Sequence, residues 1–173
     1  NMNNYIYPNY FGNVSAMSLA NLAGMVVILV LSTFIVKLSA KVGKKELSVI
    51  GSIISAAAFL ILFFIHTDNV WVWIVLVLIS SVGTAMFNMV IWAMITDVID
   101  ESEVQTGVRQ DGTIYSVYSF ARKLGQACSS GLSGVLLSII GYTTATAFDP
   151  KVADGIYNIT CLVPAGGMIL LLL

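Results

Sequence analysis

Charged residues are scarce in this sequence of 173 residues, in which Asp, Glu, Lys and Arg together account for 10%. A soluble globular domain usually carries about 25%. Hydrophobic residues make up 58% of the chain, and its mean hydropathy is +0.92. Long uncharged stretches satisfy their backbone groups in lipid by forming helices. The composition therefore argues against an ordinary soluble domain and predicts an all-α integral membrane protein.

Cysteine, histidine and proline are also rare, with two, one and three residues. Cys128 and Cys161 lie in apolar stretches, so we predict small packing residues rather than a disulfide or a metal pair. The single histidine, His66, ends an apolar stretch, which is more typical of a solvated loop residue than of a proton-coupling group. The sequence has no nucleotide-binding loop, Ser-His-Asp order or metal-ligand cluster, so we expect neither an enzyme nor a cofactor. The net charge of −1 does not indicate nucleic acid as a partner.

Five apolar segments are each about long enough to cross a bilayer. The loop of residues 37–46 contains four lysines, and the positive-inside rule places it in the cytoplasm. Alternation then places residues 97–112 in the cytoplasm and residues 143–155 outside. We expect one partial transmembrane domain over residues 1–173, in a multi-pass protein of the plasma membrane surrounded by lipid bilayer. The predicted spans are residues 14–36, 47–65, 70–96, 113–142 and 156–173, the last broken early by Pro164 and Gly166-Gly167.

The polar segment of residues 97–112 holds five of the nine acids in the chain, together with Arg109. Closely spaced carboxylates can bind a divalent metal, but an exposed loop end with lysine and arginine nearby is the commoner explanation. We therefore predict ion pairs here rather than a metal site. The five acids are Asp97, Asp100, Glu101, Glu103 and Asp111.

Arg122 and Lys123 lie inside the fourth predicted span, and their depth has two interpretations. Arg122 follows Gly112 by ten residues, which is roughly 15 Å of helix and half of a hydrocarbon core about 30 Å thick. Charges at that depth need a partner or a polar cavity and indicate a functional site. Alternatively, residues 124–142 form the span and both cations lie at the cytoplasmic surface. The uncharged residues 113–121 favour the deep position, because surface helices usually carry Lys and Arg on their polar face.

Asn88 and Trp92 lie four residues apart, on one face of the third predicted span. An amide can bind sugar hydroxyls, while an indole stacks on the apolar face of a pyranose. The alternative is helix–helix packing with one interhelical hydrogen bond, and the two residues by themselves favour this alternative.

A long ordered motif resembles a known family, the glycoside–pentoside–hexuronide:cation symporters of the major facilitator superfamily. The loop between the tenth and eleventh helices of that family resembles Asp97-(x)2-Asp100-(x)2-Glu103-(x)2-Thr106-Gly107-Val108-Arg109-(x)2-Gly112-(x)2-Tyr115-Ser116. The similarity continues through Phe120-Ala121-Arg122-Lys123-Leu124-Gly125-Gln126-Ala127 to Gly141-Tyr142, and the loop after the eighth helix resembles Lys41-(x)-Gly43-Lys44-Lys45. The chain departs from the family at Asp100-Glu101-Ser102-Glu103, where Asp-Tyr-Gly-Glu is frequent.

The resemblance implies the C-terminal helical bundle of that superfamily, with this chain supplying helices eight to twelve. Lys123 is similar to the single intramembrane lysine of the eleventh helix, which lies near the sugar and cation pocket, and this favours the deep position. Arg122 resembles the glucuronide-like branch, and two buried cations suit an anionic sugar. The implied substrate and cation pocket comprises Lys123, Arg122, Tyr118, Ser119, Asn88 and Trp92, and the implied ion pairs of a cytoplasmic gate comprise Asp97, Asp100, Glu103 and Arg109.

The function that the resemblance implies is symport of a sugar glycoside, pentoside or hexuronide with Na⁺ or H⁺, by alternating access. The alternative is a non-transporting membrane sensor or scaffold that keeps the transporter fold. The chain starts without Met and stops inside an apolar run, so we expect a piece of a longer protein whose N-terminal half is the missing partner. In the melibiose carrier branch that half holds the acids that bind the coupling cation.

Overall fold

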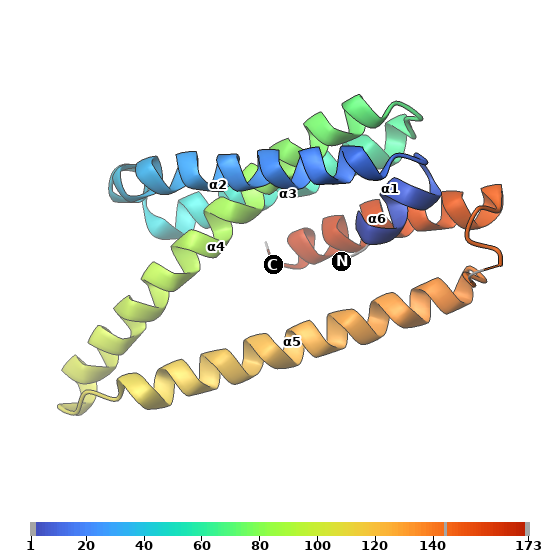
Figure 1. Cartoon of the computed structure of the whole chain (residues 1–173). Coiled ribbons are helices and arrows are strands. Elements are labelled where there is room, and N and C mark those ends of the chain that lie inside the picture. Colours follow the sequence, from blue (N-terminus) through green and yellow to red (C-terminus); the bar gives the residue numbers. More distant parts are fainter. Residues whose placement is uncertain (1–2, 144, 172–173) are drawn as a thin grey trace.

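The computed structural model describes residues 3–143 and 145–171, and within them the chain forms six helices and no strands (Figure 1). The predicted all-α fold class is confirmed. The helices are α1 (Asn3–Asn9), α2 (Val14–Val42), α3 (Lys44–Ile65), α4 (Val70–Thr106), α5 (Asp111–Ile139) and α6 (Pro150–Leu170).

Polar caps and glycine set the ends of the helices. The Asn13 side chain accepts a hydrogen bond from the amide of Ala16 at the start of α2. Asn69 accepts from the amide of Trp71 in the same way at the start of α4. Gly107 ends α4 in the left-handed conformation, with φ of 70°, which a residue without Cβ adopts at little cost.

Helix α4 is longer than the sequence indicated. Residues 97–112 were expected to form a loop, but α4 continues to Thr106 and α5 begins at Asp111. Acidic residues such as Glu103 are compatible with a helix, and the first strong stop signal is Gly107. Four of the five acids therefore lie on the last turns of α4 rather than in an irregular loop, and the fifth, Asp111, is the first residue of α5.

Helix α6 also begins earlier than expected, at Pro150. The Asp149 side chain accepts a hydrogen bond from the amide of Lys151, and the proline occupies the first turn, where a helix needs no amide donor. The expected break at Pro164 is wrong, since α6 is continuous through that residue. A proline removes one helical hydrogen bond, and helices that cross membranes tolerate this loss.

In the described chain, four helices are long and apolar enough to cross a membrane: α2, α3, α4 and α6. Helix α5 is 29 residues long, but it carries Arg122, Lys123 and many serines and glycines, so its mean hydropathy is lower. The assignment of α5 as a fifth span stays a prediction, as do the predicted positions at which the spans meet the membrane surface.

Helices α3 and α4 form the closest helix pair of the fold, and Gly51 and Gly83 lie where they cross. A Cβ atom added to Gly51 would lie 2.7 Å from the carbonyl oxygen of Gly83, so only glycine allows this approach. Helix α6 packs against α3, and α2 packs against α4. Helix α5 lies apart from this group, meeting α4 near the Gly107 turn and returning to α6 at its other end (Figure 1).

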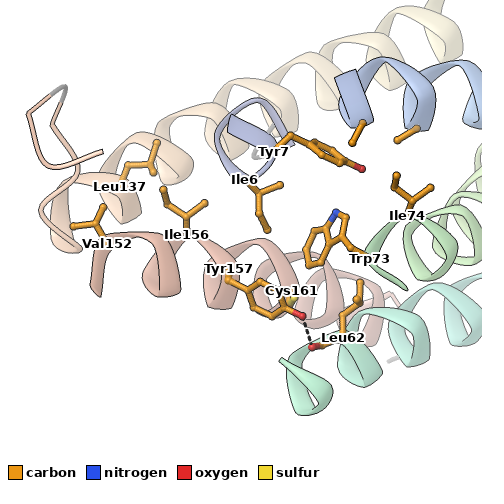
Figure 2. Close-up of a cluster of buried hydrophobic side chains, with 12 residues drawn as sticks. Ile6, Tyr7, Leu62, Trp73, Ile74, Leu137, Val152, Ile156, Tyr157 and Cys161 are labelled. Carbon is orange, nitrogen blue, oxygen red and sulfur yellow. Dashed lines mark hydrogen bonds between the residues drawn. The ribbon is translucent and has the colours of Figure 1, made fainter. Parts of the chain in front are cut away.

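The largest cluster of buried side chains lies at the predicted outer end of the bundle (Figure 2). Trp73 of α4 and Tyr157 of α6 are fully buried there, with ring centroids 5.0 Å apart. The Tyr157 hydroxyl donates to the carbonyl oxygen of Leu62 at 2.7 Å and so joins α6 to α3. Cys161 lies in this cluster, which confirms its predicted packing role, whereas Cys128 is exposed on α5.

Replacement of Gly83 by alanine is expected to lower the free energy of unfolding by about 2 kcal/mol or more. The new Cβ would overlap the carbonyl oxygen of Gly51 and lie 2.9 Å from the amide nitrogen of Ser55. Thermal unfolding of the purified protein in detergent measures the change. Gly134→Ala on α5 is the matched control, because a Cβ there has no described atom within 4 Å and alanine favours helix. Equal stability of the two variants would contradict the close crossing.

Candidate functional site

The residues proposed from the sequence for substrate binding lie on α4 and α5, which diverge from the turn at Gly107 (Figure 1). Side chains of the two helices can therefore meet only within a few turns of Gly107, and farther along the helices a cavity separates them. The site has two parts for this reason, one aromatic and basic and the other lined by hydroxyls.

The aromatic and basic part is centred on the indole of Trp92. The guanidinium carbon of Arg122 lies 5.4 Å from the centre of that ring, in a cation–π arrangement. Tyr118 approaches the indole edge-on, with centroids 5.5 Å apart, and Tyr115 lies 5.9 Å away at a tilt. Trp92, Tyr118 and Arg122, which were proposed from the sequence, thus lie together across the α4–α5 interface, and Tyr115 is an addition.

The other three proposed pocket residues lie outside this contact. Asn88 lies one turn before Trp92 on α4, and its side-chain nitrogen donates to the carbonyl oxygen of Thr84 at 2.9 Å. Ser119 is half-buried on α5, and Lys123 is exposed. Within the described residues, neither Arg122 nor Lys123 has an ion-pair partner, so both positive charges are open to a ligand or to another segment.

The acids at the end of α4 form two separate ion-pair groups. Asp97 pairs with Lys44, whose ammonium nitrogen lies 2.6 Å from a carboxylate oxygen and joins α3 to α4. Arg109 contacts Glu103 at 2.7 Å, Asp111 at 2.8 Å and Asp100 at 3.3 Å. The structure therefore brings Arg109 together with Asp100 and Glu103, but places Asp97 with a lysine that the sequence argument did not select.

Arg109 is the bridge between the end of α4 and the start of α5. Hydrogen bonds to Asp111 and Glu103 raise the pKa of its guanidinium above the ordinary value, so it stays charged at any physiological pH. All of these side chains are about half exposed, where single ion pairs contribute little to stability. Such pairs can be broken and remade at low cost. Asp111 lies only two residues after Arg109, in the first turn of α5, and this short spacing is what the sequence offers to predict their ion pair.

The second part of the site is a cavity of about 590 Å³ lined mainly by α4, α5 and α6, with Ile28 of α2 and Phe59 of α3 completing its wall. Its size is typical of small-molecule sites. Asn88 is the proposed residue that lines it. Hydroxyl side chains from all three helices share the lining, and on α4 and α5 these are Ser80, Ser81, Thr84, Ser129 and Ser133.

Behind the cavity wall, a buried hydroxyl group joins α3 to α4. Ser55 of α3 is fully buried, and its oxygen lies 2.9 Å from that of Ser80 and 3.2 Å from that of Thr84. The backbone carbonyl of Thr84 also accepts the hydrogen bond from the Asn88 side chain. Sequence reasoning missed these three hydroxyl residues, although Ser and Thr within otherwise apolar spans are typical of hydrogen bonds between membrane helices.

His66 is at the other end of the molecule, as its position after an apolar run predicted. It ends α3 in the left-handed conformation, and its ring nitrogen lies 3.5 Å from a carboxylate oxygen of Asp154. Its side chain is 40% exposed, in line with a solvated end residue. In the described part of the chain, no group of three or more His, Cys, Asp or Glu side chains is placed to hold a metal ion.

Comparison with known proteins gives both a family and individual relatives. Residues 2–173 match the sequence model of a family described as "MFS/sugar transport protein". The chain is 36% identical over 93% of its length to an uncharacterized symporter of Bacillus subtilis (strain 168), YjmB, of which it covers 35%. It is 34% identical over 76% of its length to the glucuronide carrier protein homolog of Escherichia coli (strain K12), covering 29% of that protein.

A third relative is a putative sulfoquinovose importer of Salmonella typhimurium, to which the chain is 33% identical over 72% of its length, covering 26% of that protein. The chain thus spans about a third or less of the length of these relatives. No solved structure matches it significantly.

Proposed function

Because this chain belongs to the MFS/sugar transport protein family, we propose that it is part of a carrier for a negatively charged sugar. It is a multi-pass membrane protein of a transporter family, and not an enzyme. The proposed carrier couples sugar uptake to Na⁺ or H⁺ and needs no organic cofactor. Two six-helix halves would rock around a site at the middle of the membrane, and the N-terminal half would complete the carrier.

The observation that carries the proposal is the position of Arg122 over the indole of Trp92. The cation–π contact with the indole orients the Arg122 guanidinium, and the N–H groups of the guanidinium can still bind a carboxylate in a bidentate manner. Lys123, the next residue on α5, carries a second positive charge outside this contact. An aromatic side chain next to a guanidinium suits a pyranose ring that carries an acidic group.

The names of two relatives support an acidic substrate. One is called a glucuronide carrier homolog and another a putative sulfoquinovose importer, and both names denote sugars with an anionic group. A carboxylate and a sulfonate differ in shape but share the negative charge that Arg122 and Lys123 would attract. We therefore propose a hexuronide or a similar acidic sugar as the substrate class.

Lys123 would act differently from Arg122 in the transport cycle. Its side chain is exposed on α5, and in the complete carrier it would pair with an acid of the N-terminal half. An intramembrane lysine is costly without such a partner. Binding of substrate or coupling cation would change this pair and thereby favour one orientation of the two halves.

The ion pairs of Arg109 and Asp97 would stabilise one closed state at the cytoplasmic side. They join α3 to α4 and α4 to α5 by contacts that are about half exposed and can break during each cycle. Their loss is therefore expected to affect the rate of conformational change more than the binding of sugar.

Replacement of Arg122 by leucine in the complete carrier should raise the KM for methyl-β-D-glucuronide about 10- to 100-fold, the value of a charged hydrogen bond. Uptake of the labelled sugar into membrane vesicles measures it. Lys151→Gln, at the first turn of α6, is the control and should leave uptake unchanged. Unchanged uronide uptake by the Arg122 variant would contradict the proposed role.

Imposed ion gradients test the coupling and the position of Lys123. Vesicles are given a Na⁺ gradient or a H⁺ gradient separately, and one of the two should drive uronide accumulation. The Lys123→Gln variant should lose this accumulation, because the charge that responds to substrate and cation is gone. Unaffected uptake in the variant would place Lys123 at the membrane surface. Absence of uptake for every sugar would favour the scaffold alternative.

Replacement of Arg109 by alanine should change the maximal uptake rate by about two- to fivefold, as expected for a few exposed ion pairs, and leave the KM unaltered. Initial rates over a range of sugar concentrations separate the two parameters. Lys41→Ala, an exposed lysine near the end of α2, serves as the control. A change in KM alone would show that Arg109 acts on binding rather than on the gate.

A further inference from the structure

The cavity between α4, α5 and α6 is distinct in character from the contact of Arg122 with Trp92. None of the described residues that line it is charged. Apolar side chains such as Phe59 and Met168 form part of the wall, and hydroxyl and amide groups form the rest. A lining of this composition carries no net charge and suits an uncharged ligand that has both apolar faces and hydroxyl groups.

The polar groups of the cavity come from facing helices. Thr84 and Asn88 lie one turn apart on α4, while Ser129 and Ser133 lie one turn apart on α5. Within the described chain, the Asn88 amide makes one side-chain hydrogen bond, to the carbonyl of Thr84, so its Oδ1 and its second N–H can bind a ligand. The Thr84 and Ser133 hydroxyls each donate to a carbonyl of their own helix, at 3.0 and 2.9 Å, so they offer acceptors to a ligand. Donors can come from the Asn88 amide and the Ser129 hydroxyl.

The α4 wall of the cavity is held in place from behind. The buried Ser55 hydroxyl contacts both Ser80 and Thr84, and the glycine crossing keeps α3 against α4. This fixes the height and rotation of the α4 groups that face the cavity. A polar wall supported in this way can discriminate between ligands by hydrogen bonding.

The cavity and the aromatic and basic contact are neighbours along α4, since Asn88, which lines the cavity, lies one turn before Trp92. On α5, Ser129 follows Arg122 by seven residues, which is about 10 Å of helix. A ligand anchored by an acidic group at Arg122 would therefore reach the hydroxyls only with a second, neutral part.

From this geometry we propose that the cavity is a subsite for the uncharged, hydroxyl-bearing part of the transported glycoside, and that Ser129 and Ser133 are specificity-determining residues within it. The inference rests on the proposed function, because the acidic end of the ligand is placed at Arg122. It deepens that function by adding to the acidic sugar bound at Arg122 a second sugar ring that occupies the cavity.

The test compares two ligands on the complete carrier purified in detergent, by isothermal titration calorimetry. One ligand is free glucuronate, and the other is an aldobiouronic acid in which glucuronate is linked to xylose. The double variant Ser129→Ala/Ser133→Ala should bind the disaccharide about tenfold more weakly, because two neutral hydrogen bonds are lost. Its affinity for glucuronate should stay within about twofold, since the acidic contact is intact.

Ser130→Ala is the matched control, because Ser130 is exposed on the same helix and is not a lining residue of the cavity. It should leave both affinities unchanged. If the wild type binds both ligands and the double variant weakens neither or both equally, the subsite is refuted while the proposed substrate class stands. If the wild type binds neither ligand, the proposed substrate class is refuted together with the subsite.

Discussion

The close approach of α3 and α4 at Gly51 and Gly83 is the constraint on which the rest of the structure depends. In lipid, apolar side chains gain little from contact with one another, so helices associate where small residues let backbones pack closely. The glycine pair allows this, and the neighbouring Ser55 hydroxyl bonds across the interface. Helices α2 and α6 then pack against a pair whose relative position is already set.

Polar groups in this fold are concentrated on α4 and α5 rather than spread evenly. Helix α4 presents hydroxyls and Asn88 to the cavity, Trp92 to Arg122, and carboxylates to Lys44 and Arg109, along successive turns. One helix thus connects the cavity, the aromatic and basic contact and the ion pairs. A rotation or shift of α4 would change the geometry of the cavity, of the aromatic and basic contact and of the ion pairs together. This arrangement suits the proposed carrier, which must link binding to a change of conformation.

Helix α5 contrasts with the others because it is mostly exposed and contacts α4 over a short length. Its serines, glycines and basic pair make it the least apolar of the long helices. Such a helix is stable in a membrane only when its polar face meets other protein groups or a water-filled site. This agrees with the proposal that Lys123 faces the other half of the carrier.

The sequence by itself determined the helical class, four of the apolar helices and the family, because hydrophobic length and ordered motifs are local properties. It also indicated three residues of the aromatic and basic contact, since Trp92, Tyr118 and Arg122 have recognisable chemistry. Only the tertiary structure decided the partner of Asp97, the Ser55 hydroxyl group and the cavity. These depend on which residues of separate helices come to the same height, and that is set by the crossing of α3 and α4 and by the turn at Gly107, not by spacing along the chain.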